Sequence, residues 1–144
     1  MIRAVRSMAA RVLATLALCG GVPAVFGAAP ASAPGTRSAP SWGAIAAKPG
    51  AHGYAFNQNS RATAERLARV QCEQAARRGG TSGTCEIRAY FDRSCGALAT
   101  GNFGEWGAAY ALTADAAGKA AVTQCDGHLP TEPCRLAVAV CSLP

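Results

Sequence analysis

Residues 60–72 read Ser-Arg-Ala-Thr-Ala-Glu-Arg-Leu-Ala-Arg-Val-Gln-Cys, and a stretch of the same kind, residues 113–125, begins 53 residues later. Both stretches are rich in alanine, both place apolar residues at helical spacing, and both end on Gln-Cys. Ser60 and Thr113 are suitable N-cap residues, because their hydroxyls can accept hydrogen bonds from amides of the first turn. We therefore expect two equivalent helices, one ending at Cys72 and the other at Cys125.

Short runs typical of strands surround each helix in the same order. The expected strands are 42–46, 53–56 and 85–91 in the first copy, and 95–99, 106–111 and 134–141 in the second. The unit is thus strand-strand-helix-strand, written twice, in residues 41–92 and 93–144. Neither copy alone can bury its hydrophobic face. We therefore expect one domain over residues 41–144, of α+β class, with antiparallel sheet and two packed helices.

The last strand of each copy shows a period of two. Alternating positions predict one inward-facing set per strand, because successive side chains of a strand point to opposite faces. The two predicted sets are Cys85, Ile87, Ala89 and Phe91, and Cys134, Leu136, Val138 and Val140.

Residues 1–31 have the pattern of a secretory signal peptide. Arg3, Arg6 and Arg11 form a positive region, the apolar run 12–18 follows, and small residues lead to a cleavage site near Ala31. The apolar run is shorter than the roughly 20 residues that a membrane-spanning helix needs. We therefore expect a secreted or periplasmic mature protein without a membrane span.

Two further expectations concern the N-terminal region. Residues 32–40 are rich in Ala, Pro and Ser and are expected to form a disordered linker. Cys19 raises the alternative of a lipid anchor, which is disfavoured because Leu18 stands where a lipobox has a small residue. Loss of the three signal arginines lowers the net charge from +6 to +3, which is too small to indicate nucleic-acid binding.

Six cysteines remain after cleavage, and an even number in an exported chain indicates three disulfides. A zinc site is disfavoured, because no C-x-x-C pair is present and the two histidines, His52 and His128, are far apart in the sequence. The repeat reduces the number of disulfide pairings to be considered. Cys72–Cys85 and Cys125–Cys134 occupy equivalent places between a helix end and the next strand, which leaves Cys95 to pair with Cys141.

Four stretches stand out together: Trp-Gly-Ala-Ile-Ala at 42–46, Gly-Tyr-Ala-Phe-Asn at 53–57, the helix 60–72 and Cys-Gly-Ala-Leu-Ala at 95–99. Through them the chain resembles the DUF4189 family of bacterial exported proteins, over about residues 42–141. The resemblance implies a small exported domain with no established catalytic residues or cofactor.

No stretch carries a catalytic signature. His52 is expected in a hairpin turn and His128 in a disulfide loop, both solvated. The glycine series at 101, 104 and 107 lies between two expected strands and precedes no helix, so it lacks the context of a phosphate-binding loop. The arginines of the first helix are read as a solvated face, with an acidic lipid or polymer as the alternative. We therefore expect no catalytic, cofactor-binding or metal-ligating residues.

Aromatic residues gather beside the expected hairpins, and Phe103 and Trp106 would be natural anchors for a partner if they are exposed. We therefore expect a non-enzymatic interaction module that binds another exported protein or an envelope component, for instance by inhibiting a secreted enzyme or toxin. One alternative is a small hydrolase acting on cell-wall or carbohydrate polymer, which requires His52 or His128 beside a carboxylate in a pocket. The other is a structural envelope component without a discrete ligand.

Overall fold

The computed structural model describes residues 38–143, so the expected signal peptide (1–31), Cys19 and most of the expected linker (32–40) lie outside the described residues. The strand-strand-helix-strand unit occurs twice, as the sequence predicts. The first copy consists of β1 (Trp42–Lys48), β2 (Ala51–Gln58), α1 (Arg61–Arg78) and β3 (Glu86–Asp92). The second consists of β4 (Cys95–Thr100), β5 (Trp106–Ala111), α2 (Ala114–Asp126) and β6 (Arg135–Cys141).

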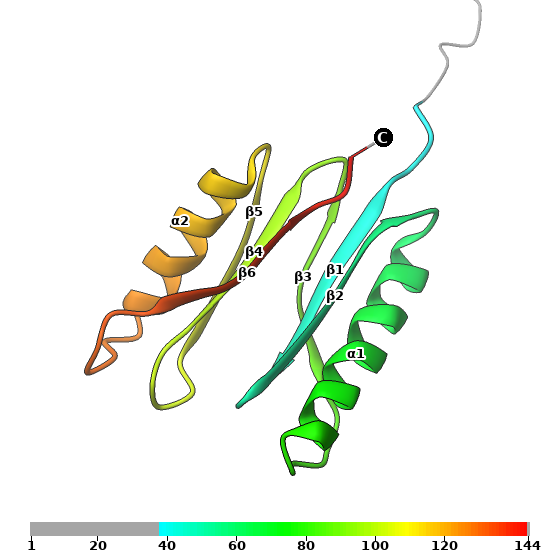
Figure 1. Ribbon diagram of the computed structural model, residues 1–144. Coiled ribbons are helices and arrows are strands. Elements are labelled where there is room, and N and C mark those ends of the chain that lie inside the picture. Colours follow the sequence, from blue (N-terminus) through cyan, green and yellow to red (C-terminus); the bar gives the residue numbers. More distant parts are fainter. Residues whose placement is uncertain (1–37, 144) are drawn as a thin grey trace, which may run out of the picture. The chain divides into compact units, whose positions relative to one another are not determined.

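Each repeat forms its own three-stranded antiparallel sheet, with the orders β2-β1-β3 and β5-β4-β6. The two sheets lie face to face, and α1 and α2 cover their outer faces (Figure 1). The predicted α+β class is therefore confirmed, and the antiparallel sheet is divided into two halves that share an inner layer. Among residues 38–143, neither helix has an apolar run of the length required to cross a membrane.

The small residues of β1 and β4 face two different layers. Ala44 and Ala46 pack against α1, whereas Ile45, between them, enters the layer between the sheets and is fully buried. Leu98 of β4 takes the equivalent inner position. Successive side chains of a strand point to opposite faces. Each of these short strands therefore packs against a helix with one face and against the other repeat with its second face.

The helices sit very close to their sheets. A Cβ at Gly53 would overlap the backbone of α1 at Cys72, and a Cβ at Gly107 would overlap the backbone of α2 at Cys125. The helix faces in contact consist mainly of alanine, with Ala64, Ala68 and Ala76 buried on α1. Alanine and glycine therefore set the short helix–sheet distance.

The Gln-Cys pair at the end of each predicted helix has a structural role in both repeats. Gln71 Oε1 accepts a hydrogen bond from the backbone N–H of Tyr54 at 2.6 Å, and Gln124 Oε1 accepts from that of Ala108 at 2.8 Å. Both amides belong to edge strands, β2 and β5. The neighbouring cysteines form disulfides to the start of the next strand. The structure contains Cys72–Cys85, Cys125–Cys134 and Cys95–Cys141, the same three pairs that the repeat predicts.

Two details of the sequence reading are wrong. Ser60 and Thr113 cap their helices as expected, but α1 does not end at Cys72. It continues to Arg78 and ends at Gly79, because the alanine-rich pattern runs on past the disulfide.

The second error concerns the inward sets of the last strands. The register shifts once between β1 and β3, at Arg88, and once between β4 and β6, at Ala137. Each shift is a bulge, at which the third strand has one residue more than the strand it pairs with. Beyond the bulge, the positions whose side chains faced the helix are therefore exchanged with those that faced the other side of the sheet. As a result each predicted set is split: Cys85 and Ile87 face α1 while Ala89 and Phe91 face the inner layer, and Cys134 faces α2 while Val138 and Val140 face the inner layer. The remaining member, Leu136, is 50% exposed.

Candidate binding site

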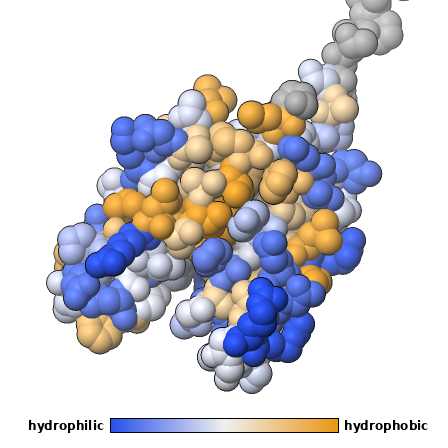
Figure 2. Space-filling model, viewed as in Figure 1, coloured by the Kyte–Doolittle hydropathy of each residue, from blue (hydrophilic) through white to orange (hydrophobic). Residues whose placement is uncertain are grey.

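A cleft of about 820 Å³ opens between the ends of the two hairpins. Its wall from the first repeat consists of residues 47–52 and Arg88, and its wall from the second repeat consists of residues 100–106 and Ala137. The surface is hollowed between these two ends, while the middle of the same face, over the strands, is mainly hydrophobic (Figure 2). Both proposed partner anchors, Phe103 and Trp106, line this cleft.

The two walls are equivalent parts of the two repeats. Each is made of the connection between the first two strands and the bulge residue of the third strand. The bulge residues, Arg88 and Ala137, are separated by the same 49 residues that separate Cys85 from Cys134. The cleft therefore forms where the same structural feature of both copies meets.

The wall from the second repeat is aromatic. Phe103 lies in the loop between β4 and β5 and is 76% exposed, although its ring is large and apolar. Trp106, at the start of β5, is partly buried and packs against the inner layer between the sheets. Large aromatic side chains such as tryptophan supply much of the binding energy where a partner buries them.

The wall from the first repeat carries a cation. The guanidinium carbon of Arg88 lies 4.1 Å from the ring centre of Trp106, so the stack joins the two repeats across the cleft. Arg88 Nη1 lies 2.8 Å from Glu86 Oε2, and Arg88 Nε is buried with no hydrogen-bond partner among the described residues. Only 18% of the Arg88 side chain is exposed.

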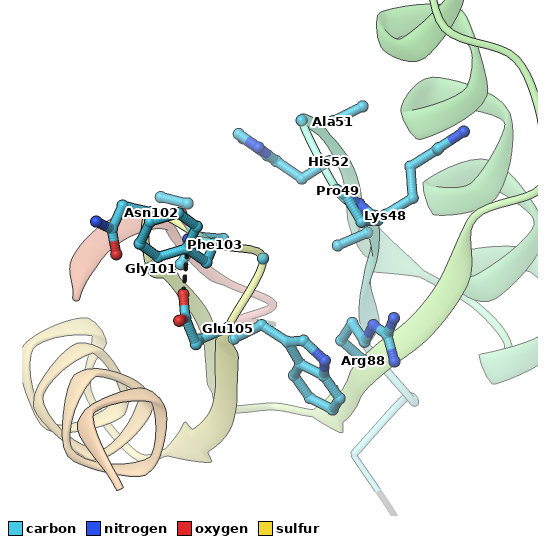
Figure 3. A pocket seen from close by; sticks show the side chains of 15 residues that line it. Lys48, Pro49, Ala51, His52, Arg88, Gly101, Asn102, Phe103 and Glu105 are labelled. Carbon is cyan, nitrogen blue, oxygen red and sulfur yellow. Dashed lines mark hydrogen bonds between the residues drawn. The ribbon is translucent and has the colours of Figure 1, made fainter. Parts of the chain in front are cut away.

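The other charged groups of the cleft are bound to neighbouring backbone. The backbone N–H of Phe103 donates to Glu105 Oε2 at 2.9 Å, which folds this carboxylate back over its own loop (Figure 3). Lys48 Nζ donates to the carbonyl oxygen of Ser82, which does not line the cleft. Arg88 is distinguished from Lys48 by a buried donor, Nε, that has no partner among residues 38–143.

The two histidines are in different places. His52 is partly buried and lines the cleft on the wall opposite Phe103 (Figure 3). His128 is exposed in the loop after α2 and is not a lining residue. Within residues 38–143, no hydrogen bond or ion pair joins either histidine to a carboxylate, and no group of three His, Cys, Asp or Glu side chains could hold a metal ion.

The charged pairs that shift pKa values lie on the helices, outside the cleft. The hydrogen bond from Arg61 to Glu65 raises the pKa of Arg61, whose guanidinium also lies over the ring of Tyr90. The hydrogen bond from Lys119 to Asp115 raises the pKa of Lys119. Both pairs join residues four apart on a helix and are open to solvent on at least one partner, and such surface pairs contribute little to stability.

Sequence reasoning placed Phe103 and Trp106 beside a hairpin but did not single out Arg88. The reason is the bulge, which turns Arg88 toward the second repeat and leaves no mark in the alternation of residues. The signal that could have found it is the repeat itself, since the aligned position holds arginine in one copy and alanine in the other.

Comparison with known proteins gives one match. The family model described as "Domain of unknown function (DUF4189)" matches residues 42–141, from the first residue of β1 to the last residue of β6. Neither the curated proteins nor the solved structures gave a match. The matched segment includes both repeats, all three disulfides and the cleft, and the chain therefore belongs to the DUF4189 family.

Proposed function

We propose that the domain is a non-catalytic, exported binding module that holds a partner protein in the cleft between its two hairpins. The observation that carries the proposal is the exposure of Phe103 beside the Trp106–Arg88 stack. Tryptophan, arginine and other large side chains at the centre of a cleft supply most of the binding energy in protein complexes. The partner would be another exported protein or an envelope component, and inhibition of a secreted enzyme is one form of this function.

The scaffold around the cleft supports a binding role. Each helix is tied to the following strand by a disulfide, at Cys72 within α1 and at Cys125 in the last turn of α2, and a third disulfide joins β4 to β6. A site held in one conformation before binding loses less conformational entropy when the partner arrives. Three disulfides also agree with an oxidising compartment, and so with export.

The test is capture with the oxidised mature protein, immobilised and exposed to envelope and secreted extracts of the producing cells. Phe103→Ala and Trp106→Ala should each reduce the amount of captured partner at least tenfold. The matched control is Leu129→Ala, because Leu129 is an apolar residue that is 87% exposed and lies outside the cleft. Equal capture by the wild type and both cleft variants would contradict the proposal.

The hydrolase alternative has one observation in its favour, since His52 and Glu105 line the same cleft. Against it, the Glu105 carboxylate is engaged by the backbone of its own loop. Release of soluble products from cell-wall polymer by the wild type, lost in His52→Ala, would favour this alternative over binding.

A further inference from the structure

We propose that Arg88 is the specificity-determining residue of the cleft and that it recognises a carboxylate of the partner protein, placed next to an apolar side chain that contacts Phe103. This inference rests on the proposed function, because it names the chemistry of the partner in the same cleft. The carboxylate would belong to an Asp or Glu side chain or to a chain terminus.

The first step is the position of Arg88. In β3 Ile87, before the bulge, faces α1, whereas Ala89 and Phe91, after it, face the layer between the sheets. Arg88 is the extra residue at this point, and its guanidinium reaches across to the ring of Trp106 in the other repeat. Bulges commonly redirect one side chain toward a site. The equivalent bulge in β6 carries Ala137, so a bulge at this place does not require a cation.

The second step is the unused hydrogen-bonding capacity of Arg88. A guanidinium has five N–H donors in a fixed plane, and the edge formed by Nε and Nη2 matches the two oxygens of a carboxylate. Glu86 is bound to Nη1, and this ion pair does not involve Nε or Nη2. Nε is closed off from solvent and has no partner among residues 38–143. A buried donor without an acceptor is rare in native proteins. Because Nε is closed off in this structure, a carboxylate that pairs with it must displace the side chains that cover it.

The third step is the distribution of charge and apolar surface. Trp106 covers one face of the guanidinium, which leaves its edge for a ligand. Glu105 is hydrogen-bonded to the amide of Phe103, and the carboxylate paired with Arg88 is that of Glu86, whose side chain is 71% exposed. Arg88 and Phe103 come from opposite walls, and the space between them is the cleft itself (Figure 3). A carboxylate beside an apolar group is complementary to this pair, whereas a cationic group would be repelled by Arg88.

The experiment uses two small probes that differ in one group. N-acetylphenylalanine carries a carboxylate, and N-acetylphenylalanine amide has the same ring with a neutral amide in its place. Each is titrated into the oxidised mature protein while the indole N–H of Trp106 and the Nε–H of Arg88 are followed by NMR. We expect the acid to shift both signals with at least tenfold higher affinity than the amide. Equal affinity of the two probes, or no response to either, would overturn the inference.

Variants connect the probes to the captured partner. Arg88→Gln should remove the preference for the acid, and Arg88→Lys should restore little of it, because an ammonium keeps the charge but lacks the planar two-donor edge. Arg66→Gln is the control, since it removes the same charge from an exposed site on α1. An unchanged melting temperature and an unchanged NMR fingerprint outside the cleft establish that each variant is folded.

Capture of the partner separates failure of this inference from failure of the proposed function. If Phe103→Ala reduces capture and Arg88→Gln does not, carboxylate recognition is wrong and the binding module remains. If neither variant reduces capture, both carboxylate recognition and the proposed binding function are wrong. Loss of capture in both variants, at least tenfold in each, supports the two together.

Discussion

The hairpin of the first repeat turns over Pro49 and Gly50, whereas the hairpin of the second repeat is connected by the longer loop 101–105. The wall residues differ as well. His52 follows the short turn and Trp106 follows the long loop, and the bulge residue is Arg88 in one copy and Ala137 in the other. The ends of the strands away from the hairpins also differ, since Cys95 pairs with Cys141 where the first repeat has Trp42 opposite Asp92.

The contacts between helix and sheet are the same in both copies. Each helix has a hydroxyl N-cap, a stripe of buried alanine, a glutamine bound to an edge-strand amide, and a cysteine bound to the next strand. The two copies thus keep what positions the helices and differ in what lines the cleft. We infer that the residues shared by the two copies stabilise the scaffold. Function is therefore expected at the hairpin ends, where the copies differ.

The largest expected effect concerns the residue at the centre of the inner layer. Phe91 is 3% exposed, and its ring lies against both Gly43 and Gly96, where an added Cβ would overlap it. Its counterpart at the same repeat position is the smaller and less buried Val140. Phe91→Ala should lower the free energy of unfolding by about 3 to 5 kcal/mol, whereas Val140→Ala should lower it by about 1 to 2 kcal/mol.

Urea unfolding of the oxidised proteins at one temperature measures both losses. The comparison is informative because the two residues are equivalent by repeat but not by packing. Equal losses would mean that the inner layer is divided evenly between the repeats and that Phe91 is not its central residue.

The next effect concerns the two equivalent disulfides. Cys72–Cys85 closes a separation of 13 residues and Cys125–Cys134 one of 9, so the chain-entropy contributions are similar. Replacing either pair by alanine should lower the free energy of unfolding by about 3 kcal/mol. Denaturant unfolding of the two double variants measures both losses. Mass spectrometry first establishes that the other two disulfides are intact in each variant. A loss several times larger in one repeat would show that the two helix ends are not held in the same way.

Much of the fold could be predicted because it is written twice. The order of elements and the expected disulfide pairs followed from recurrence of Gln-Cys, of the hydroxyl caps and of the strand runs, at a spacing of 53 residues up to the helices and 49 residues for the last strands. A single copy would not have been enough to predict the order of elements, because alanine-rich helices such as 114–126 carry only a weak amphipathic pattern. The second copy supplied the confirmation that one short pattern lacks.

The features that sequence reasoning missed depend on contacts between distant segments. Leu136 fits a period of two with Val138, yet the bulge at Ala137 places the two side chains on opposite faces of β6. The division into two sheets also has no local signal, since Ile45 and Leu98 are apolar in either arrangement. The cleft shares this cause. His52 and Arg88 are 36 residues apart along the chain although both line the wall from the first repeat, and only packing of the two repeats brings Arg88 against Trp106.

The smallest expected effect tests the glutamine that both repeats keep. The outer edges of β2 and β5 present backbone amides that would otherwise be open to pairing with another strand, and Gln71 and Gln124 each occupy one of them. Both side chains are exposed, so Gln71→Ala or Gln124→Ala should lower the free energy of unfolding by only about 0.5 to 1 kcal/mol.

The local effect of these two substitutions is larger than the global one. Amide hydrogen exchange at Tyr54 should accelerate in Gln71→Ala and exchange at Ala108 should accelerate in Gln124→Ala, each without a change in the other repeat, because each side chain is bound to its own edge strand. Gln74→Ala, at an exposed position of α1, is the control and should change neither amide. If one glutamine variant accelerated exchange in both repeats, the glutamine would be stabilising the packing of the repeats on each other and not the edge of its own sheet.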